Sequence, residues 1–250
     1  IKNEGFITSY LDNNDELFLE LNDSIFKKEI LVVTRFVQLP SNYSGYINAG
    51  SKTSEQVIKF EKKGEKIYII QKSFTNIANE IDPINISVTK NNLSPILASF
   101  KILNKEKNEY LIDVSSFFLK DSPGFNIIRK TQRDRYKIGR ADKSRSSIDS
   151  ANSYPQNLEI THTLTFDASN PPRGNNSKTL TFQINHSFIE LPKNPMPPRY
   201  TDHRVGWFSV EKTNYSSQEL KSDTYRIAQR WRLEPKDLEA YNNGELTEPV

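Results

Sequence analysis

Hydrophobic and polar residues alternate most regularly over residues 157–190. Two alternating runs flank the turn-rich sequence ASNPPRGNNS, and their apolar positions are Leu158, Ile160, His162, Leu164, Phe166, Leu180, Phe182, Ile184, His186 and Phe188. A period of two predicts strands with one buried face, and the sequence between them predicts a β-hairpin. If the loop is symmetric about Gly174, His162 lies opposite His186.

Shorter apolar runs earlier in the chain predict further strands. Hairpins are expected at residues 5–21 and 56–71, a strand at 29–36, and a pair of strands at 96–103 and 109–114. Strands recur at short spacing with turn signals between them, and they do not alternate with long helices. The predicted fold class is therefore mostly β, as an antiparallel β-sandwich or two packed β layers with a few short helices.

Residues 129–145 (RKTQRDRYKIGRADKSR) form the most basic stretch, with eight Lys or Arg residues against Asp134 and Asp142. Charge runs of this kind are typical of solvated connectors. We therefore predict a basic connector at 129–150 between an N-terminal β region (1–128) and a C-terminal β region (151–250), with one continuous domain as the alternative.

Composition and motifs exclude several kinds of function. The charge is nearly balanced, with 34 basic and 31 acidic residues, so nucleic acid is not an expected partner. There is no cysteine for a disulfide or a thiolate site, and no run of 18 apolar residues that would span a membrane. The chain has no HExxH, GxSxG, P-loop or GxGxxG motif, and is not an evident enzyme by itself.

The two histidines on the apolar face of the long hairpin are the only candidates for metal ligands. Two imidazoles can share a metal ion, but zinc needs a third and usually a fourth ligand. His203, the remaining histidine, lies in a different predicted loop. We therefore interpret His162 and His186 as a core pair whose protonation at low pH would loosen the hairpin, and we expect no cofactor in this chain.

Residues 195–236 combine arginines with aromatic side chains and include both tryptophans. Strands are expected at 205–214 and 225–233. Guanidinium groups stack on aromatic rings and bind carboxylates, so such a cluster is typical of a surface that fixes one domain against another. The alternative is a well-packed domain end. The predicted docking residues are Arg199, Tyr200, Asp202, Arg204, Trp207, Arg230, Trp231 and Arg232.

Several sequence segments carry a resemblance to a known family. They are PMPPRYTDHRVGWFSV and RWRLEPKD near the C-terminus, and ILVVTRF, PILASFKI, DVSSFF and DKSRSSIDSANSYPQNLEI before them. In this order they resemble the N-terminal, non-catalytic region of bacterial secreted zinc-dependent metalloproteases, a region described as a domain of unknown function. The likeness covers nearly the whole chain.

The resemblance implies a partner and a location. In that family a metzincin-like catalytic domain with an HExxHxxGxxH-type zinc motif follows directly, and no position of this chain matches that motif. The expected partner is thus a downstream metalloprotease domain of the same polypeptide, with zinc bound there. The expected location is secreted, periplasmic or at the bacterial cell surface.

Two roles follow from these expectations. The first is an accessory or pro-region that packs against the protease domain and supports its fold, gates its cleft, or both, with Asp202 blocking the zinc as a narrower hypothesis. The second is an extracellular protein- or glycan-binding β module. It would use the polar loops at 42–54 and 168–177, with Tyr43 and Tyr46 as stacking aromatics.

Overall fold

The structure is a computed structural model that describes residues 1–216 and 221–248. Strands hold 44% of the residues and helices 12%, so the predicted mostly β class is confirmed. The chain forms two compact units. Unit 1 comprises residues 1–72 and 94–191, and unit 2 comprises residues 73–93 and 192–250.

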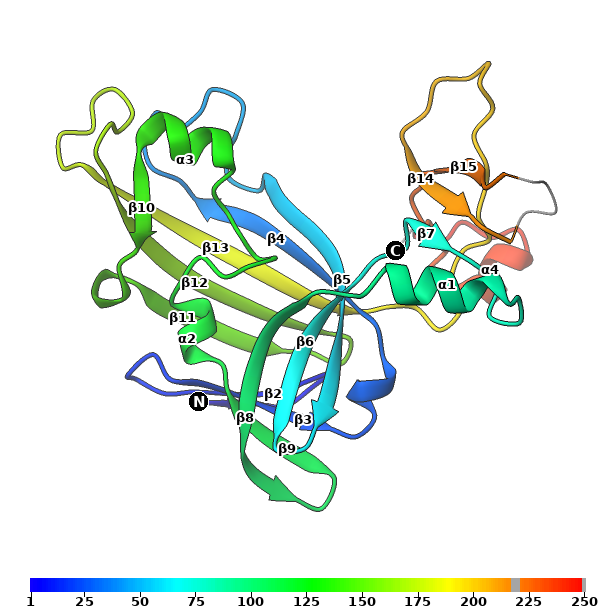
Figure 1. The fold of residues 1–250 in the computed structure, drawn as a ribbon, viewed down its shortest axis with the longest axis horizontal. Coiled ribbons are helices and arrows are strands. Elements are labelled where there is room, and N and C mark those ends of the chain that lie inside the picture. The colour runs from blue at the N-terminus through cyan, green and yellow to red at the C-terminus, as the bar shows by residue number, and fades with distance from the viewer. Residues whose placement is uncertain (217–220, 249–250) are drawn as a thin grey trace. The chain divides into compact units, whose positions relative to one another are not determined.

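Unit 1 is built on one sheet in which every pair of neighbouring strands is antiparallel (Figure 1). The strand order is β1-β2-β3-β9-β8-β6-β5-β4-β13-β12-β10, and β11 also pairs with β12. The strands are β1 (Lys2–Asn3), β2 (Thr8–Leu11), β3 (Leu17–Asn22), β4 (Ile30–Gln38), β5 (Lys52–Lys63), β6 (Lys66–Lys72), β8 (Ile96–Glu106), β9 (Glu109–Asp113), β10 (Ile138–Ala141), β11 (Ser147–Ser153), β12 (Asn157–Ala168) and β13 (Thr179–Glu190).

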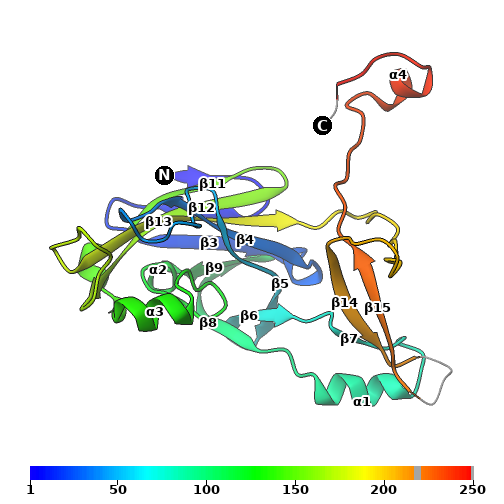
Figure 2. The ribbon, with the colours of Figure 1, turned by 90° about the horizontal axis from the view of Figure 1, so that it is seen from above.

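The sheet curls so strongly that its first strands return to β11 (Figure 2). The Ser9 hydroxyl donates to the Ala151 carbonyl at 2.8 Å, and the Phe6 amide donates to the Tyr154 carbonyl at 2.7 Å. A Cβ on Gly5 would lie 2.6 Å from that same Tyr154 oxygen, so the close approach requires glycine. The two layers expected from the sequence are two parts of one curled sheet.

The inward-facing side chains form two hydrophobic clusters inside this curl. The larger one includes Phe60, Leu158 and Phe188, and the short helix α2 (Ser115–Phe118) contributes Phe117 and Phe118 to it. The smaller one includes Phe166 and Phe182, with Tyr43 and Tyr136 against them. Alternating burial along β12 and β13 follows the alternation in the sequence.

The boundary expected at residues 129–150 lies inside unit 1. This segment forms α3 (Lys130–Tyr136), β10, the 3-10 turn η2 (Lys143–Arg145) and the start of β11. Tyr136 and Ile138 are buried in the smaller cluster, and the Tyr136 hydroxyl donates to the Tyr43 carbonyl at 2.6 Å. The segment is thus anchored in unit 1 by a few buried apolar side chains between its charged residues. It is not a connector between domains.

The predicted register of the long hairpin is wrong by two residues. His162 pairs with Ile184, and Leu164 pairs with Phe182, because the loop is centred on Arg173 and not on Gly174. A shift of two residues keeps each side chain on its face of the sheet, so the apolar face is the one predicted.

Unit 2 contains a three-stranded sheet and two short helices. The sheet order is β15-β14-β7, with β7 (Asn76–Ile77) parallel to β14 (Ser209–Asn214) and β15 (Asp223–Ala228) antiparallel to it. The helices are α1 (Ile84–Asn91) and α4 (Leu238–Asn242). The strand expected at 205–214 begins at Ser209, and the one expected at 225–233 ends at Ala228. Unit 1 also has a 3-10 turn η1 (Ile25–Lys27). Within the described residues, no helix has the length and apolarity needed to cross a membrane.

Candidate functional site

Unit 2 has no buried core among its described residues. Every residue that is buried in the structure belongs to unit 1. Sixteen of the twenty-two large hydrophobic side chains that are exposed lie in unit 2, including Trp207, Phe208, Trp231 and Leu233. Soluble proteins rarely expose so many large apolar side chains in one region.

The predicted docking residues around Tyr200 come together on unit 2. The backbone near Tyr200 extends the β14–β15 pair, because the Ala228 amide donates to the Arg199 carbonyl at 2.8 Å. The ring of Tyr200 packs edge-on against Tyr225, with 5.1 Å between the ring centroids. A cavity of about 320 Å³ opens beside it, and its lining includes five of the eight predicted residues: Arg199, Tyr200, Asp202, Trp207 and Arg230.

The tryptophans of this surface differ in how firmly they are held. The indole N–H of Trp207 donates to the Gln229 carbonyl at 2.7 Å, which fixes the ring while 62% of the residue stays exposed. Trp231 lies beyond the end of β15 and is 89% exposed. The next residue, Arg232, binds the Asn194 carbonyl at 2.6 Å, which ties this segment to the proline-rich stretch before Tyr200. Both indole rings thus remain largely open to solvent.

Asp202 forms a local turn with Arg204. Its Oδ1 accepts the Arg204 backbone N–H at 2.9 Å, and its Oδ2 lies 2.6 Å from the guanidinium. These hydrogen bonds hold the pKa of Asp202 below its usual value, so the carboxylate is ionised near neutral pH. Both oxygens already have a partner within the turn, as is common for Asp in this position.

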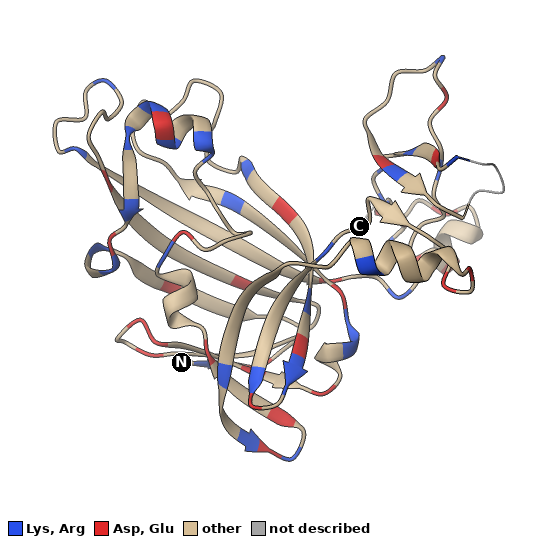
Figure 3. Cartoon of the chain, in the orientation of Figure 1, with Lys and Arg blue, Asp and Glu red and all other residues tan. Residues whose placement is uncertain are grey.

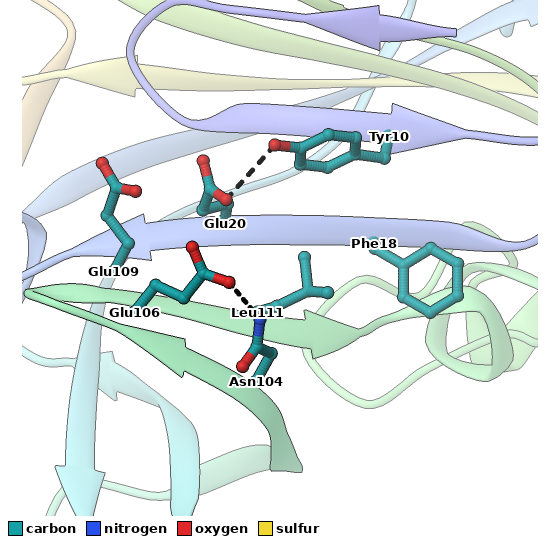
Figure 4. A pocket seen from close by; sticks show the side chains of 7 residues that line it. All are labelled: Tyr10, Phe18, Glu20, Asn104, Glu106, Glu109 and Leu111. Carbon is teal, nitrogen blue, oxygen red and sulfur yellow. Dashed lines mark hydrogen bonds between the residues drawn. The ribbon is translucent and has the colours of Figure 1, made fainter.

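A second concave feature lies on unit 1, on the face of β2, β3, β9 and β8 opposite the core. It is a groove of about 460 Å³ lined by Tyr10, Phe18, Glu20, Asn104, Glu106, Glu109 and Leu111. Figure 4 shows the rings of Tyr10 and Phe18 toward one end and the carboxylates of Glu106 and Glu109 toward the other. The register agrees, since Tyr10 pairs with Phe18 and Glu106 pairs with Glu109.

The polar groups of the groove are only partly satisfied. The Tyr10 hydroxyl donates to Glu20 at 3.2 Å, and the Asn104 amide donates to Glu106 at 3.1 Å. Burial, followed by the charge of Glu20, raises the pKa of Tyr10, so its phenol stays a donor. The groove therefore offers two aromatic surfaces and several acceptor oxygens to a ligand rich in hydroxyl groups. These residues are far apart in the chain and meet only through strand pairing, so the alternation within single strands does not reveal them.

The two histidines of the long hairpin meet in the core despite the shifted register. Their Nε2 atoms are 2.8 Å apart, and Nδ1 of His186 lies 2.8 Å from the Thr34 hydroxyl. Residues displaced by two positions across a strand pair are diagonal neighbours, which explains the contact. The rings of Phe118 and Phe125 pack on His186.

Burial keeps both imidazoles neutral. It lowers the pKa of His162 to about 4, against a smaller opposing effect of the Phe118 backbone, and it lowers the pKa of His186 well below 6.5. A contact between two ring nitrogens needs one donor and one acceptor, so it is satisfied only while at least one ring is neutral. Within the described residues, no group of three or more His, Cys, Asp or Glu side chains is placed to hold a metal ion.

The polar loops at 42–54 and 168–177 offer only one exposed tyrosine. Tyr46 is exposed, but Tyr43 is 2% exposed and its ring packs edge-on against Phe182. Its hydroxyl donates to Gln132 at 3.0 Å, which places the phenol inside unit 1. The expectation that Tyr43 stacks against a ligand is therefore wrong, because the aromatic contacts of the smaller cluster bury it.

Fold and surface together define a β-rich region with one self-contained curled sheet and one exposed Arg- and Trp-rich face. Residues 50–236 match the family model of a domain of unknown function (DUF5117), and residues 1–39 match that of a second domain of unknown function (DUF5118). The first match spans most of the chain, which belongs to the DUF5117 family. Neither a search of curated proteins nor one of solved structures returns a match.

Proposed function

We propose that this chain is a non-catalytic accessory region that packs through unit 2 against a zinc-dependent metallopeptidase domain of the same polypeptide. The observation that carries the proposal is the absence of buried residues in the described part of unit 2, where most of the exposed large apolar side chains gather. The partner follows from the resemblance of the sequence segments around RVGWF and RWRLEPKD to the region that precedes such domains.

Energetics favour a partner for this surface. Ordering a residue costs about 1–2 kcal/mol of backbone entropy, which proteins offset mainly by burying apolar area. Unit 2 holds its strands and turns by hydrogen bonds and exposed ion pairs such as Arg226–Glu211, and exposed pairs contribute about 0–1 kcal/mol each. Burial of Trp207 and Trp231 against another domain would supply the missing apolar contacts, at roughly 1.5–3 kcal/mol or more for each large side chain.

A titration tests the proposal. The metallopeptidase domain is expressed separately, the 250-residue chain is added, and binding is followed together with peptidase activity on an unfolded protein. We expect Trp207→Ala and Trp231→Ala each to weaken binding by about 2 kcal/mol, roughly 30-fold, as central aromatic anchors do. Tyr46→Ala is the matched control, because Tyr46 is a 96% exposed aromatic residue on unit 1.

The activity readout distinguishes the possible roles. Binding with loss of activity means an inhibitory pro-region, whereas binding with gained or unchanged activity means a supporting or substrate-guiding region. If the chain does not bind, or if Tyr46→Ala weakens binding as much as the tryptophan variants, the proposal fails. The blocking role of Asp202 has its own test: unchanged activity of the full-length protease on Asp202→Ala contradicts it.

The groove on unit 1 favours a second candidate function, a glycan-binding module. Tyr10 and Phe18 would stack on sugar rings, and Glu20, Glu106 and Asn104 would bind hydroxyl groups. Affinity electrophoresis through gels that contain soluble polysaccharides tests this function. Retardation that is lost in Tyr10→Ala but kept in Tyr154→Ala supports it, because Tyr154 is an exposed tyrosine outside the groove. Equal mobility with and without each polysaccharide argues against it.

A further inference from the structure

Positive charge is concentrated at one end of unit 1. This basic end consists of residues 129–145 and 167–178, which hold ten Lys or Arg residues against Asp134, Asp142 and Asp167. Its excess of seven basic residues is larger than the excess of three in the whole chain, so the remaining residues are net acidic. Figure 3 shows the Lys and Arg positions on α3, β10 and the adjoining loops.

The fold holds the two segments of the basic end together. Ile138 of β10 pairs with Ala168 of β12, and the side chain of Asn170 donates to the Arg135 carbonyl at 2.8 Å. The loop around Arg173 is held in turn by the Asn42 side chain, which donates to the Arg173 carbonyl at 3.1 Å. The cations therefore project from a fixed scaffold of one helix, one strand and one hairpin loop.

Most of these cations have no acidic partner. Arg133 binds Asp121, and Arg145 binds both Asp142 and Asp167. The other basic side chains are exposed and form no ion pair among the described residues: Arg129, Lys130, Arg135, Lys137, Arg140, Lys143, Arg173 and Lys178. Asp134 is the one acidic residue of the basic end without such a pair. Like charges held close together repel one another, so this arrangement costs stability and suits an anionic partner.

The shape and composition of the basic end favour a broad anionic surface. A single-stranded nucleic acid needs aromatic side chains on which its bases stack, and the one aromatic residue among 129–145, Tyr136, is buried. The apolar residues Ile127, Ile128 and Ile138 are buried as well, so these side chains are not available for insertion into a hydrocarbon layer. Cations spread over several elements match an array of lipid phosphates instead.

We propose that the basic end of unit 1 binds the phosphate headgroups of an anionic lipid bilayer electrostatically, without insertion. The proposal rests on unit 1 alone and is independent of docking by unit 2. Each Lys or Arg near an anionic bilayer surface strengthens binding roughly five-fold, and salt screens the attraction within a distance of about 10 Å at 0.1 M.

Co-sedimentation with vesicles tests the proposal on the whole 250-residue chain. Vesicles of phosphatidylcholine alone are compared with vesicles that contain 30% phosphatidylglycerol, at 50 mM and 500 mM NaCl. We expect binding to the anionic vesicles at low salt only. The triple variant Arg135→Gln, Arg140→Gln, Arg173→Gln should weaken this binding roughly 100-fold, because three of the unpaired cations are removed.

A second triple variant controls for net charge. Lys101→Gln, Lys105→Gln, Lys107→Gln removes the same charge from β8 and its turn, outside the basic end, and should leave binding nearly unchanged. Far-UV circular dichroism verifies that both variants are folded. No binding to anionic vesicles, an equal loss in both variants, or equally tight and salt-sensitive binding to duplex DNA or heparin would each overturn the assignment to lipid.

Discussion

Lowering the pH from 7.5 to 5.5 should destabilise unit 1 through the buried pair of His162 and His186. In the unfolded chain both imidazoles titrate near pH 6.5, whereas burial lowers the pKa of His162 to about 4 in the fold and lowers that of His186 in the same direction. Groups with a depressed pKa in the fold contribute stability that is present above pH 6.5 and is lost as the pH falls toward the folded pKa. Stability must therefore decrease on acidification.

The magnitude follows from proton linkage. Between pH 7.5 and 5.5 the unfolded state takes up nearly one proton per histidine while the folded state takes up almost none, and over this range the difference in bound protons is worth about 1.4 kcal/mol per histidine. The pair together should lose about 3 kcal/mol. For a chain of this size, that loss lowers the midpoint of thermal unfolding by roughly 6–12 °C.

The assay must report on unit 1. Both tryptophans lie in unit 2, so their fluorescence would follow the wrong part of the molecule. Far-UV circular dichroism follows the curled sheet, and urea titrations at pH 7.5, 6.5 and 5.5 give the free energy of unfolding at each pH. Stopping at pH 5.5 keeps carboxylates of ordinary pKa ionised in both the folded and the unfolded state. Burial raises the pKa of Asp121, so protonation of Asp121 on acidification stabilises the fold and opposes the effect of the histidines.

Two variants decide whether the histidine pair is the cause. The triple variant Thr34→Val, His162→Leu, His186→Leu replaces all hydrogen-bonding partners by apolar groups of similar size, and should be nearly as stable as the wild type at pH 7.5. It should lose less than about 1 kcal/mol on acidification. His203→Gln alters the exposed histidine of unit 2 and should keep the wild-type loss. A triple variant that still loses about 3 kcal/mol would refute the reasoning, and so would a wild type that is equally stable at both pH values.

The remaining predictions concern the closure of the sheet, one buried ion pair and the N-terminal strands. Gly5→Ala should lower the free energy of unfolding by about 1–3 kcal/mol, because its Cβ would lie 2.6 Å from the Tyr154 carbonyl oxygen. Urea titration measures this loss, and unchanged stability would contradict the close approach. Arg133→Met should destabilise unit 1 by about 3 kcal/mol at pH 7, because the Asp121 carboxylate is then buried without its cation. The loss of stability should be smaller at pH 5, because the Asp121 carboxylate takes up a proton. Thermal unfolding scans at both pH values measure the two losses. Removal of residues 1–39 should abolish the cooperative unfolding of the whole unit in circular dichroism, whereas a truncated chain that keeps a sharp transition would show that β1–β4 are dispensable.

The sequence predicted the elements of unit 1 well because their side chains alternate. The β12–β13 hairpin has a clear apolar face, and its two histidines lie buried in contact with each other, as a core pair does. Its register depended on the centre of a turn-rich loop, and neither Gly174 nor its neighbours determine that centre locally. The basic segment was misjudged as a connector for a related reason, since the burial of Tyr136 depends on Tyr43, which is distant in the chain.

The groove and the exposed Arg- and Trp-rich face differ in how far the sequence could reveal them. Arg and aromatic residues near Trp207 and Trp231 are close in the chain, so composition alone indicated a surface there. The groove joins β2, β3, β9 and β8, and Glu20 meets Leu111 only because β3 pairs with β9 across the sheet. Such a site depends on strand order, which alternation of single strands does not encode.

The two family matches place a boundary between residues 39 and 50, but unit 1 includes the residues on both sides of it. Residues 1–39 supply β1 to β4, and these strands pair directly with strands from the other match: β3 with β9, and β4 with both β5 and β13. Buried Ile30 and Val32 of β4 lie in the same cluster as Ile58 of β5. A sheet strand removed from between two partners leaves their hydrogen-bonding groups and apolar faces exposed. Residues 1–39 and the part of the other match that lies in unit 1 therefore form one compact unit, and a function assigned to either match must be tested on both together.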